Sequence, residues 1–204
     1  MSKLKSTGEN SKTISQTSDG KGMKVSLGSG IEREAGFLRV DIDPKVNPDY
    51  CINIEKAHLP FATSTVDVVH CNNILEHLRN IDYTMEEIWR VLKPNGKLKI
   101  LVPHYRNYNA YYDPDHIRYF TENSMIYWCR DTLGSDGRPV VRGDMDFKVV
   151  NITTTVNKKA LDAVPKNLQK LALDHWWNIC EFITFEMVAV KPARNPYAKR
   201  GGKK

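Results

Sequence analysis

The stretch MKVSLGSG, residues 23–30, decides how this chain is expected to fold. Residues 23–27 form a short apolar strand, which stops at the turn Gly28-Ser29-Gly30. Glycine accepts backbone conformations that other residues avoid, and it lets a ligand approach the backbone with no Cβ in between. A strand that ends in such a turn is typical of the first strand of an α/β sheet, which binds ligands at its carboxyl edge.

Strands and helices alternate on both sides of this turn. The helical spacing of Ile81, Met85, Ile88 and Leu92 predicts a helix that ends at Pro94. Further helices are expected over residues 121–132 and from residue 165, the second of them inserted before the last strand. Further strands are predicted at residues 37–42, 50–54, 66–71, 97–102, 147–156 and 183–190. This order predicts a doubly wound, mostly parallel Rossmann-like sheet of about seven strands.

The composition fits one globular domain. The chain has 204 residues, of which 41% are hydrophobic and 26% charged, so it is not a disordered polymer. No apolar run approaches the roughly 18–20 residues that span a bilayer, and residues 1–22 lack the apolar core of a secretion signal. Its 4 cysteines contain no CxxC pair. This pattern predicts a cytoplasmic protein with no disulfide framework.

The positive charge is concentrated at the ends of the chain. The formal net charge is +6, and residues 191–204 alone contain six Lys and Arg and no acidic residue. We expect a disordered arm over residues 1–22, a domain over 23–190 and a basic flexible tail over 191–204. Such a tail can attract nucleic acid or another acidic partner, although a solubilising end is the simpler interpretation.

The residues after the first strand restrict which class of ligand can bind at the turn. Position 33 is Arg33, where the dinucleotide fingerprint has its third glycine, and Asp41 follows Gly30 by only 11 residues. That fingerprint places its acidic residue roughly 20 residues on, so the first crossover has room for a helical turn or two at most. A carboxylate at this place can accept both hydroxyls of a ribose. We assign that role to Asp41 and a turn to Asp43-Pro44.

Six short motifs occur in a characteristic order. They are KVSLGSG (24–30), VDIDP (40–44), LPF (59–61), VDVV (66–69), ILEHL (74–78) and VLKPNG (91–96). Over about residues 23–105 the chain thereby resembles the class I S-adenosylmethionine-dependent methyltransferases of the small type 11 group, with a shortened first helix. The resemblance implies S-adenosylmethionine as cofactor and a small-molecule, sugar or lipid-like acceptor. The sequence after the fourth strand, Asn72-Asn73-Ile74-Leu75, lacks the Asn/Asp-Pro-Pro-aromatic motif of enzymes that methylate nucleic-acid bases.

The resemblance also implies which residues hold the cofactor. The glycines would flank the methionine part of the cofactor, Asp41 would hold its ribose, and Leu59 would form a wall beside its adenine. Leu59 can equally belong to the core. Asn53 stands where the family often has an aspartate. The predicted set is Gly28, Ser29, Gly30, Asp41, Ile42, Asn53, Leu59 and Asn72. Glu76-His77 is interpreted as a helix cap or a polar tether.

The acceptor side is expected in the long polar and aromatic segment 103–121. Here His116, oriented by Asp113 or Asp115, is the predicted general base, with His104 as the next candidate. No helix-spaced histidine pair is present, so no metal site is expected.

The segment 157–182, which carries Trp176-Trp177, is expected to cover the pocket. Two other functions stay open: a non-catalytic module that binds S-adenosylmethionine as an assembly or regulatory subunit, and, with less support, a nicotinamide oxidoreductase.

Overall fold

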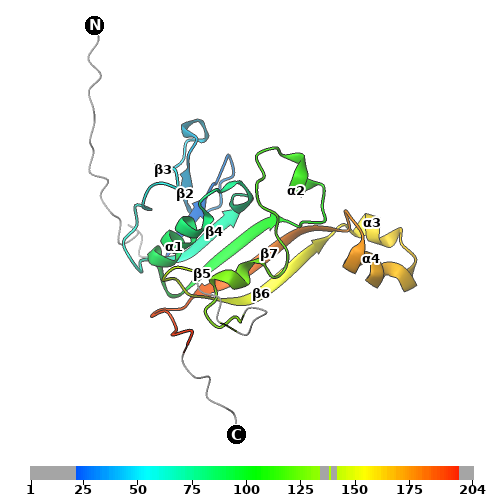
Figure 1. Cartoon of the computed structure of the whole chain (residues 1–204). Coiled ribbons are helices and arrows are strands. Elements are labelled where there is room, and N and C mark those ends of the chain that lie inside the picture. Colours follow the sequence, from blue (N-terminus) through cyan, green and yellow to red (C-terminus); the bar gives the residue numbers. More distant parts are fainter. Residues whose placement is uncertain (1–21, 134–137, 139–141, 198–204) are drawn as a thin grey trace.

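The computed structural model describes residues 22–133, 138 and 142–197 (Figure 1). Its seven-stranded sheet has the order β3-β2-β1-β4-β5-β7-β6. Strands β3, β2, β1, β4 and β5 are parallel, and β7 is antiparallel to both β5 and β6. The strands are β1 (Met23–Leu27), β2 (Leu38–Asp41), β3 (Tyr50–Cys51), β4 (Val66–Asn72), β5 (Leu92–Pro103), β6 (Phe147–Val156) and β7 (Cys180–Ala189). The predicted mostly parallel Rossmann-like sheet is confirmed.

Short helices connect these strands. They are α1 (Ile81–Val91), α2 (Asn109–Tyr112), α3 (Lys158–Asp162) and α4 (Gln169–His175), with 3-10 turns η1 (Pro44–Val46), η2 (Leu75–His77), η3 (Ser124–Trp128) and η4 (Lys166–Leu168). The helix expected over residues 121–132 is only the turn η3. The helix expected from residue 165 is divided into η4 and α4. Strand β5 begins directly after α1, earlier than predicted, because Leu92 is buried and pairs with Val66.

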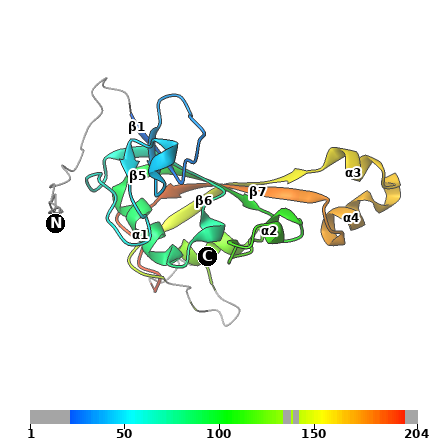
Figure 2. The same ribbon diagram turned by 90° about the horizontal axis from the view of Figure 1, so that it is seen from above.

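The core lies on the face of the sheet that α1 covers. Ile81, Met85 and Ile88 of α1 are buried, as their helical spacing predicts. Alternate residues of the central strands, such as Leu98 and Ile100 of β5, point into this core. Figure 2 shows the sheet nearly edge-on, with α1 on one side of it.

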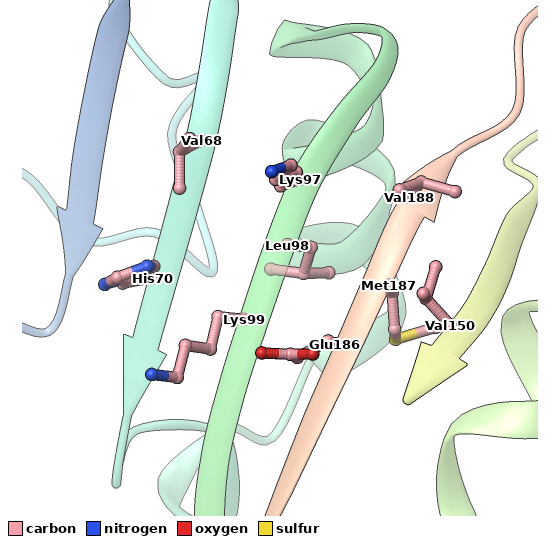
Figure 3. A pocket seen from close by; sticks show the side chains of 9 residues that line it. All are labelled: Val68, His70, Lys97, Leu98, Lys99, Val150, Glu186, Met187 and Val188. Carbon is pink, nitrogen blue, oxygen red and sulfur yellow. The ribbon is translucent and has the colours of Figure 1, made fainter. Parts of the chain in front are cut away.

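The opposite face of the central strands is open to solvent among the described residues. Lys97, Lys99 and Glu186 are exposed there, and Lys99 lies directly opposite Glu186 in the β5–β7 ladder. A hollow of about 260 Å³ runs over β4, β5 and β7 (Figure 3). Parallel sheets are usually covered on both faces. Here the connection 28–37 between β1 and β2 contains no helix, whereas the short Gly30–Asp41 spacing predicted a helical turn or two at most. The uncovered face of β5 carries lysines at alternate positions.

The chain packs beyond residue 190. Lys191 donates from Nζ to the carbonyl oxygens of Arg90 and Leu92 at 2.9 and 2.6 Å, and Arg194 pairs with buried Asp146 at 2.6 Å. These contacts differ from the flexible tail predicted to begin at residue 191. Residues 1–21 and 198–204, where the remaining predictions of arm and tail fall, lie outside the described residues. Within the described part of the chain, no helix is long and apolar enough to cross a membrane.

Candidate functional site

The glycine turn after β1 is tied to the end of β2. The backbone N–H of Gly28 donates to the carbonyl oxygen of Val40 at 2.9 Å, and that of Gly30 donates to Asp41 Oδ2 at 2.7 Å. Asp41 Oδ1 accepts from the backbone N–H of Asp43 at 2.9 Å. Each carboxylate oxygen keeps a further lone pair. Asp41 therefore fixes the turn and can still accept from a ligand.

The two glycines are required for different reasons. Both have positive φ, +59° at Gly28 and +52° at Gly30. A Cβ on Gly28 would also lie 2.5 Å from Ile74 Cγ1, whereas one on Gly30 would meet nothing within 4 Å. Buried Arg39, which we did not predict, donates to the carbonyl oxygens of Gly30 and Val46 and supports the turn. The signal for it was a charged residue inside a strand.

A hollow of about 160 Å³ lies in front of this turn. Of the predicted cofactor residues, Gly28, Asp41, Ile42 and Asn53 line it. The walls that we did not predict are mostly apolar: Ile52, Ile54, Ile74 and Leu78, with His77 and Glu55. The hollow thus offers a carboxylate at one place and apolar side chains beside it.

Two side chains, one in the turn and one after β2, are suited to contact with a ligand. Ser29 Oγ is buried and has no hydrogen-bond partner among the described residues. Ile42, next to Asp41, is 62% exposed although it is apolar. A ligand with both polar groups and an apolar ring would satisfy the first and cover the second.

Four predicted cofactor residues do not line the hollow: Ser29 and Gly30 belong to the turn behind it, and Leu59 and Asn72 lie elsewhere. Leu59 is buried in the core, where its N–H donates to Glu87 Oε2 and its carbonyl oxygen accepts from Arg90. The prediction that it walls the adenine is therefore not supported by its position. Asn72 ends β4 opposite Leu101 and does not line the hollow.

His104 is fully buried and has both ring nitrogens engaged. Its Nδ1 accepts from the backbone N–H of Arg106 at 3.1 Å, so Nε2 carries the proton and donates to Glu122 Oε1 at 3.1 Å. Burial lowers the pKa of His104, and the neighbouring Glu122 opposes that shift. With no free lone pair, His104 anchors the segment after β5 and is not placed to deprotonate an acceptor.

His116 has a free lone pair. Its Nδ1 donates to the carbonyl oxygen of Ala110 at 3.2 Å, because a carbonyl can only accept, and this leaves the lone pair on Nε2. Asp113 Oδ2 lies 4.0 Å from Nε2, while Asp115 is exposed and donates its backbone N–H to Asp113 Oδ1. Ala110 therefore orients the ring through Nδ1, and of the two predicted carboxylates Asp113 lies at ion-pair distance from Nε2.

Glu76 and His77 of η2 meet His116, which sequence reasoning missed. The backbone N–H groups of Ile117 and Arg118 donate to the carbonyl oxygen of Glu76, and the rings of His77 and His116 lie 4.6 Å apart. Glu76 is 1% exposed, and neither of its carboxylate oxygens has a hydrogen-bond partner in the described part of the chain. Burial raises the pKa of Glu76 to about 7, and the charge of Asp113 adds to that rise.

The segment that carries His116 also bears an exposed aromatic surface. The rings of Tyr111 and Tyr119 stack at 4.5 Å, and Trp177 lies 5.6 Å from Tyr111. All three side chains are about half exposed. The inserted helices α3 and α4 extend beyond the ends of β6 and β7 in Figure 1, and Arg106 donates to the carbonyl oxygen of Leu173 in α4. The segment 157–182 therefore lies beside the segment 103–121, where the acceptor is expected, and not over the hollow near β1 and β2.

Comparison with known proteins identifies the family. Residues 30–100 match the sequence profile of the family described as "Methyltransferase domain", and this range contains Asp41, the hollow's apolar walls and Glu76-His77. The chain contains a class I S-adenosylmethionine-dependent methyltransferase domain. The predicted family and its cofactor are thereby confirmed. The positions of Asp41, Ser29 and the apolar walls fit that cofactor.

One curated relative matches a short part of this chain. An uncharacterized protein of Methanocaldococcus jannaschii is 46% identical over 52 residues, which are 26% of this chain and 22% of that protein. The match thus spans about a fifth of the length of the curated relative.

Solved structures share the methyltransferase fold at low identity. YcgJ of Bacillus subtilis is 13% identical with a TM-score of 0.51, covering 86% of this chain and 93% of that one. Geranyl diphosphate C-methyltransferase of Streptomyces coelicolor A3(2) is also 13% identical, with a TM-score of 0.51 and coverage of 83% and 71%. The [4+2]-cyclase SpnF has 13% identity, a TM-score of 0.53 and coverage of 85% and 76%. Because one of these proteins is a cyclase, the fold alone leaves the reaction and the acceptor open.

Proposed function

We propose that this chain transfers a methyl group from S-adenosylmethionine to a hydroxyl group of a small-molecule, sugar or lipid-like acceptor. The observation that carries the proposal is the position of His77. It lines the hollow beside Asp41 and also packs against His116 at a ring distance of 4.6 Å. The cofactor side and the acceptor side of the site are therefore adjacent.

The cofactor would be held by residues already positioned for it. Asp41 would accept from the ribose hydroxyls with its remaining lone pairs, and Ser29 Oγ would gain the partner that it lacks. Ile42 and Ile54 supply apolar surface for the adenine ring. When bound, the cofactor supplies a methyl group that its sulfonium has already activated.

The remaining work of the site is alignment and activation of the acceptor. Methyl transfer requires an acceptor atom in line with the methyl group and protected from water. The Nε2 lone pair of His116 is the group available to activate a hydroxyl. The stacked Tyr111 and Tyr119, with Trp177, would bind an acceptor through an apolar face such as that of a sugar or an aromatic ring.

Turnover is tested by following the demethylated product of S-adenosylmethionine in the presence of sugars, phenols and lipids that carry a free hydroxyl. We expect product formation with at least one class and a methyl-sized mass increase on that acceptor. Cofactor binding without product for any class would favour the non-catalytic module. Absence of cofactor binding would contradict both functions.

A further inference from the structure

Three side chains beside the proposed acceptor position form a potential ligand set for a metal ion. One ligand atom each from Glu76, His77 and His116 lies within 4.8 Å of the other two. The set is held by backbone contacts, since the N–H of Ile117 donates to the carbonyl oxygen of Glu76 at 2.9 Å. The short turn η2 and the segment after β5 are thereby fixed against each other, and the three groups converge without further movement of the backbone.

Glu76 gives the second, independent observation. A carboxyl group that is 1% exposed should have hydrogen-bond partners, because burying it without them is costly. Within the described residues, neither Glu76 Oε1 nor Oε2 has one. A cation seated between Glu76 and the two imidazoles would supply the missing partner.

His116 has the hydrogen-bond pattern of a metal-binding histidine. Such histidines donate one ring N–H to a carbonyl or carboxylate, which directs the other nitrogen at the metal. Nδ1 of His116 donates to the carbonyl oxygen of Ala110, and Nε2 lies 4.0 Å from Asp113 Oδ2. The carboxyl groups of Glu76 and Asp113 both lie beside the His116 ring, and a divalent cation would interact favourably with both.

We propose that Glu76, His77 and His116 bind a divalent transition-metal ion, with Asp113 as an additional oxygen ligand, and that this ion activates the acceptor hydroxyl. The mixed nitrogen and oxygen donors favour Zn²⁺ or Mn²⁺ over Mg²⁺ or Ca²⁺, which prefer oxygen alone. The role in activation rests on the proposed function, while the site itself does not.

Methyl transfer at this site requires a proton to leave the acceptor and a carbon–sulfur bond to break. The acceptor oxygen binds the metal ion, which lowers the pKa of its hydroxyl, and the proton leaves through the half-exposed Asp113 to solvent. The oxygen then forms a bond to the methyl carbon as the carbon–sulfur bond breaks. The electron pair of that bond stays on sulfur, so the sulfonium becomes a neutral thioether.

The site is tested by calorimetric titration of the metal-stripped full chain with Zn²⁺ and with Mn²⁺, in the absence of acceptor. We expect one ion per chain, and at least tenfold weaker binding in His116→Ala and in the nearly isosteric Glu76→Gln. His175→Ala, which changes an exposed histidine on α4, should bind as the wild type does. Circular dichroism confirms that each variant is folded.

No stoichiometric binding, or equal binding in the wild type and both site variants, would overturn the proposal. Titration of S-adenosylmethionine in the same samples separates the two proposals. Cofactor binding without metal binding refutes the metal site alone, and metal binding without cofactor binding refutes the proposed function alone.

Discussion

Three buried carboxyl groups differ in their hydrogen bonding: two lie in well-paired regions of the fold, and one lies unpaired at the candidate site. Glu87 on α1 accepts from Arg90 and from the N–H of Leu59, and Asp146 before β6 accepts from Arg194 and from the N–H of Arg130. Glu76, at the carboxyl edge, is just as buried and has no such partner among the described residues.

The partners decide the charge state of each group. Burial alone would raise the pKa of Glu87 and of Asp146. Several hydrogen bonds together more than offset it, with the largest contributions from Arg90 and Arg194 respectively, so both pKa values are lowered. Burial raises the pKa of Glu76 to about 7. The hydrogen bonds of Glu87 and Asp146 thus stabilise the fold. The unpaired carboxyl group of Glu76 instead indicates a position where a ligand would bind.

The largest effect is expected from His116→Ala. Loss of the group that activates the acceptor should lower turnover by about 10²–10⁴-fold, whether the lone pair acts directly or through a metal ion. The affinity for S-adenosylmethionine should not change, because Asp41 and the glycine turn are untouched. Full activity in this variant, or joint loss of turnover and cofactor binding, would contradict the assignment. His175→Ala is the matched control.

Replacing Asp41 by alanine should weaken S-adenosylmethionine binding by roughly ten- to a hundredfold. A hydrogen bond to a charged group contributes about 1.5–3 kcal/mol. The control is Asp43→Ala, which removes only the cap on η1, where Asp43 Oδ1 accepts from the N–H of Lys45. Calorimetric affinities that are equal in both variants would remove Asp41 from the site.

Arg194→Ala should lower the stability of the fold and leave cofactor binding unchanged, in contrast to Asp41→Ala. Removing its hydrogen bonds to the buried Asp146 should reduce the free energy of unfolding by about 1.5–3 kcal/mol. Cofactor affinity should stay the same, since Arg194 does not line the hollow. Denaturant unfolding measures the first quantity. A wild-type stability in this variant would show that residues from 191 onward do not hold the domain.

The smallest effect concerns pH. Because Asp146 and Glu87 have lowered pKa values, their stabilisation is complete above their unfolded values near 4 and is lost as the pH falls below them. The free energy of unfolding should therefore decrease between about pH 5 and about pH 3, and less steeply in Arg194→Ala. Equal slopes in the two proteins would indicate that Asp146 gains little from Arg194.

Local patterns were enough to predict the sheet and the cofactor turn. Each pattern concerns residues that are close in the sequence. The run that ends in Gly28-Ser29-Gly30 predicts strand β1 and its turn, the alternation predicts β5, and the helical spacing predicts α1. Asp41 and Gly30, 11 residues apart, are joined in the structure by a 2.7 Å hydrogen bond.

Features made by distant segments could not be predicted in this way. Glu76 meets His116 because the segment after β5 folds back onto η2, a contact between residues about 40 positions apart. His104 is excluded as a base by the N–H of Arg106 and by Glu122, and neither contact is visible in composition or spacing. Lys191 and Arg194 looked like tail charges, yet their partners belong to α1, β5 and the segment before β6.

The most direct test of the central claim is calorimetric titration of the full chain with S-adenosylmethionine, with its demethylated product and with NAD, each also applied to Asp41→Ala. We expect micromolar binding of the first two, weaker binding of both in the variant, and no binding of NAD. Binding of NAD, or no binding of S-adenosylmethionine and its product, would contradict it.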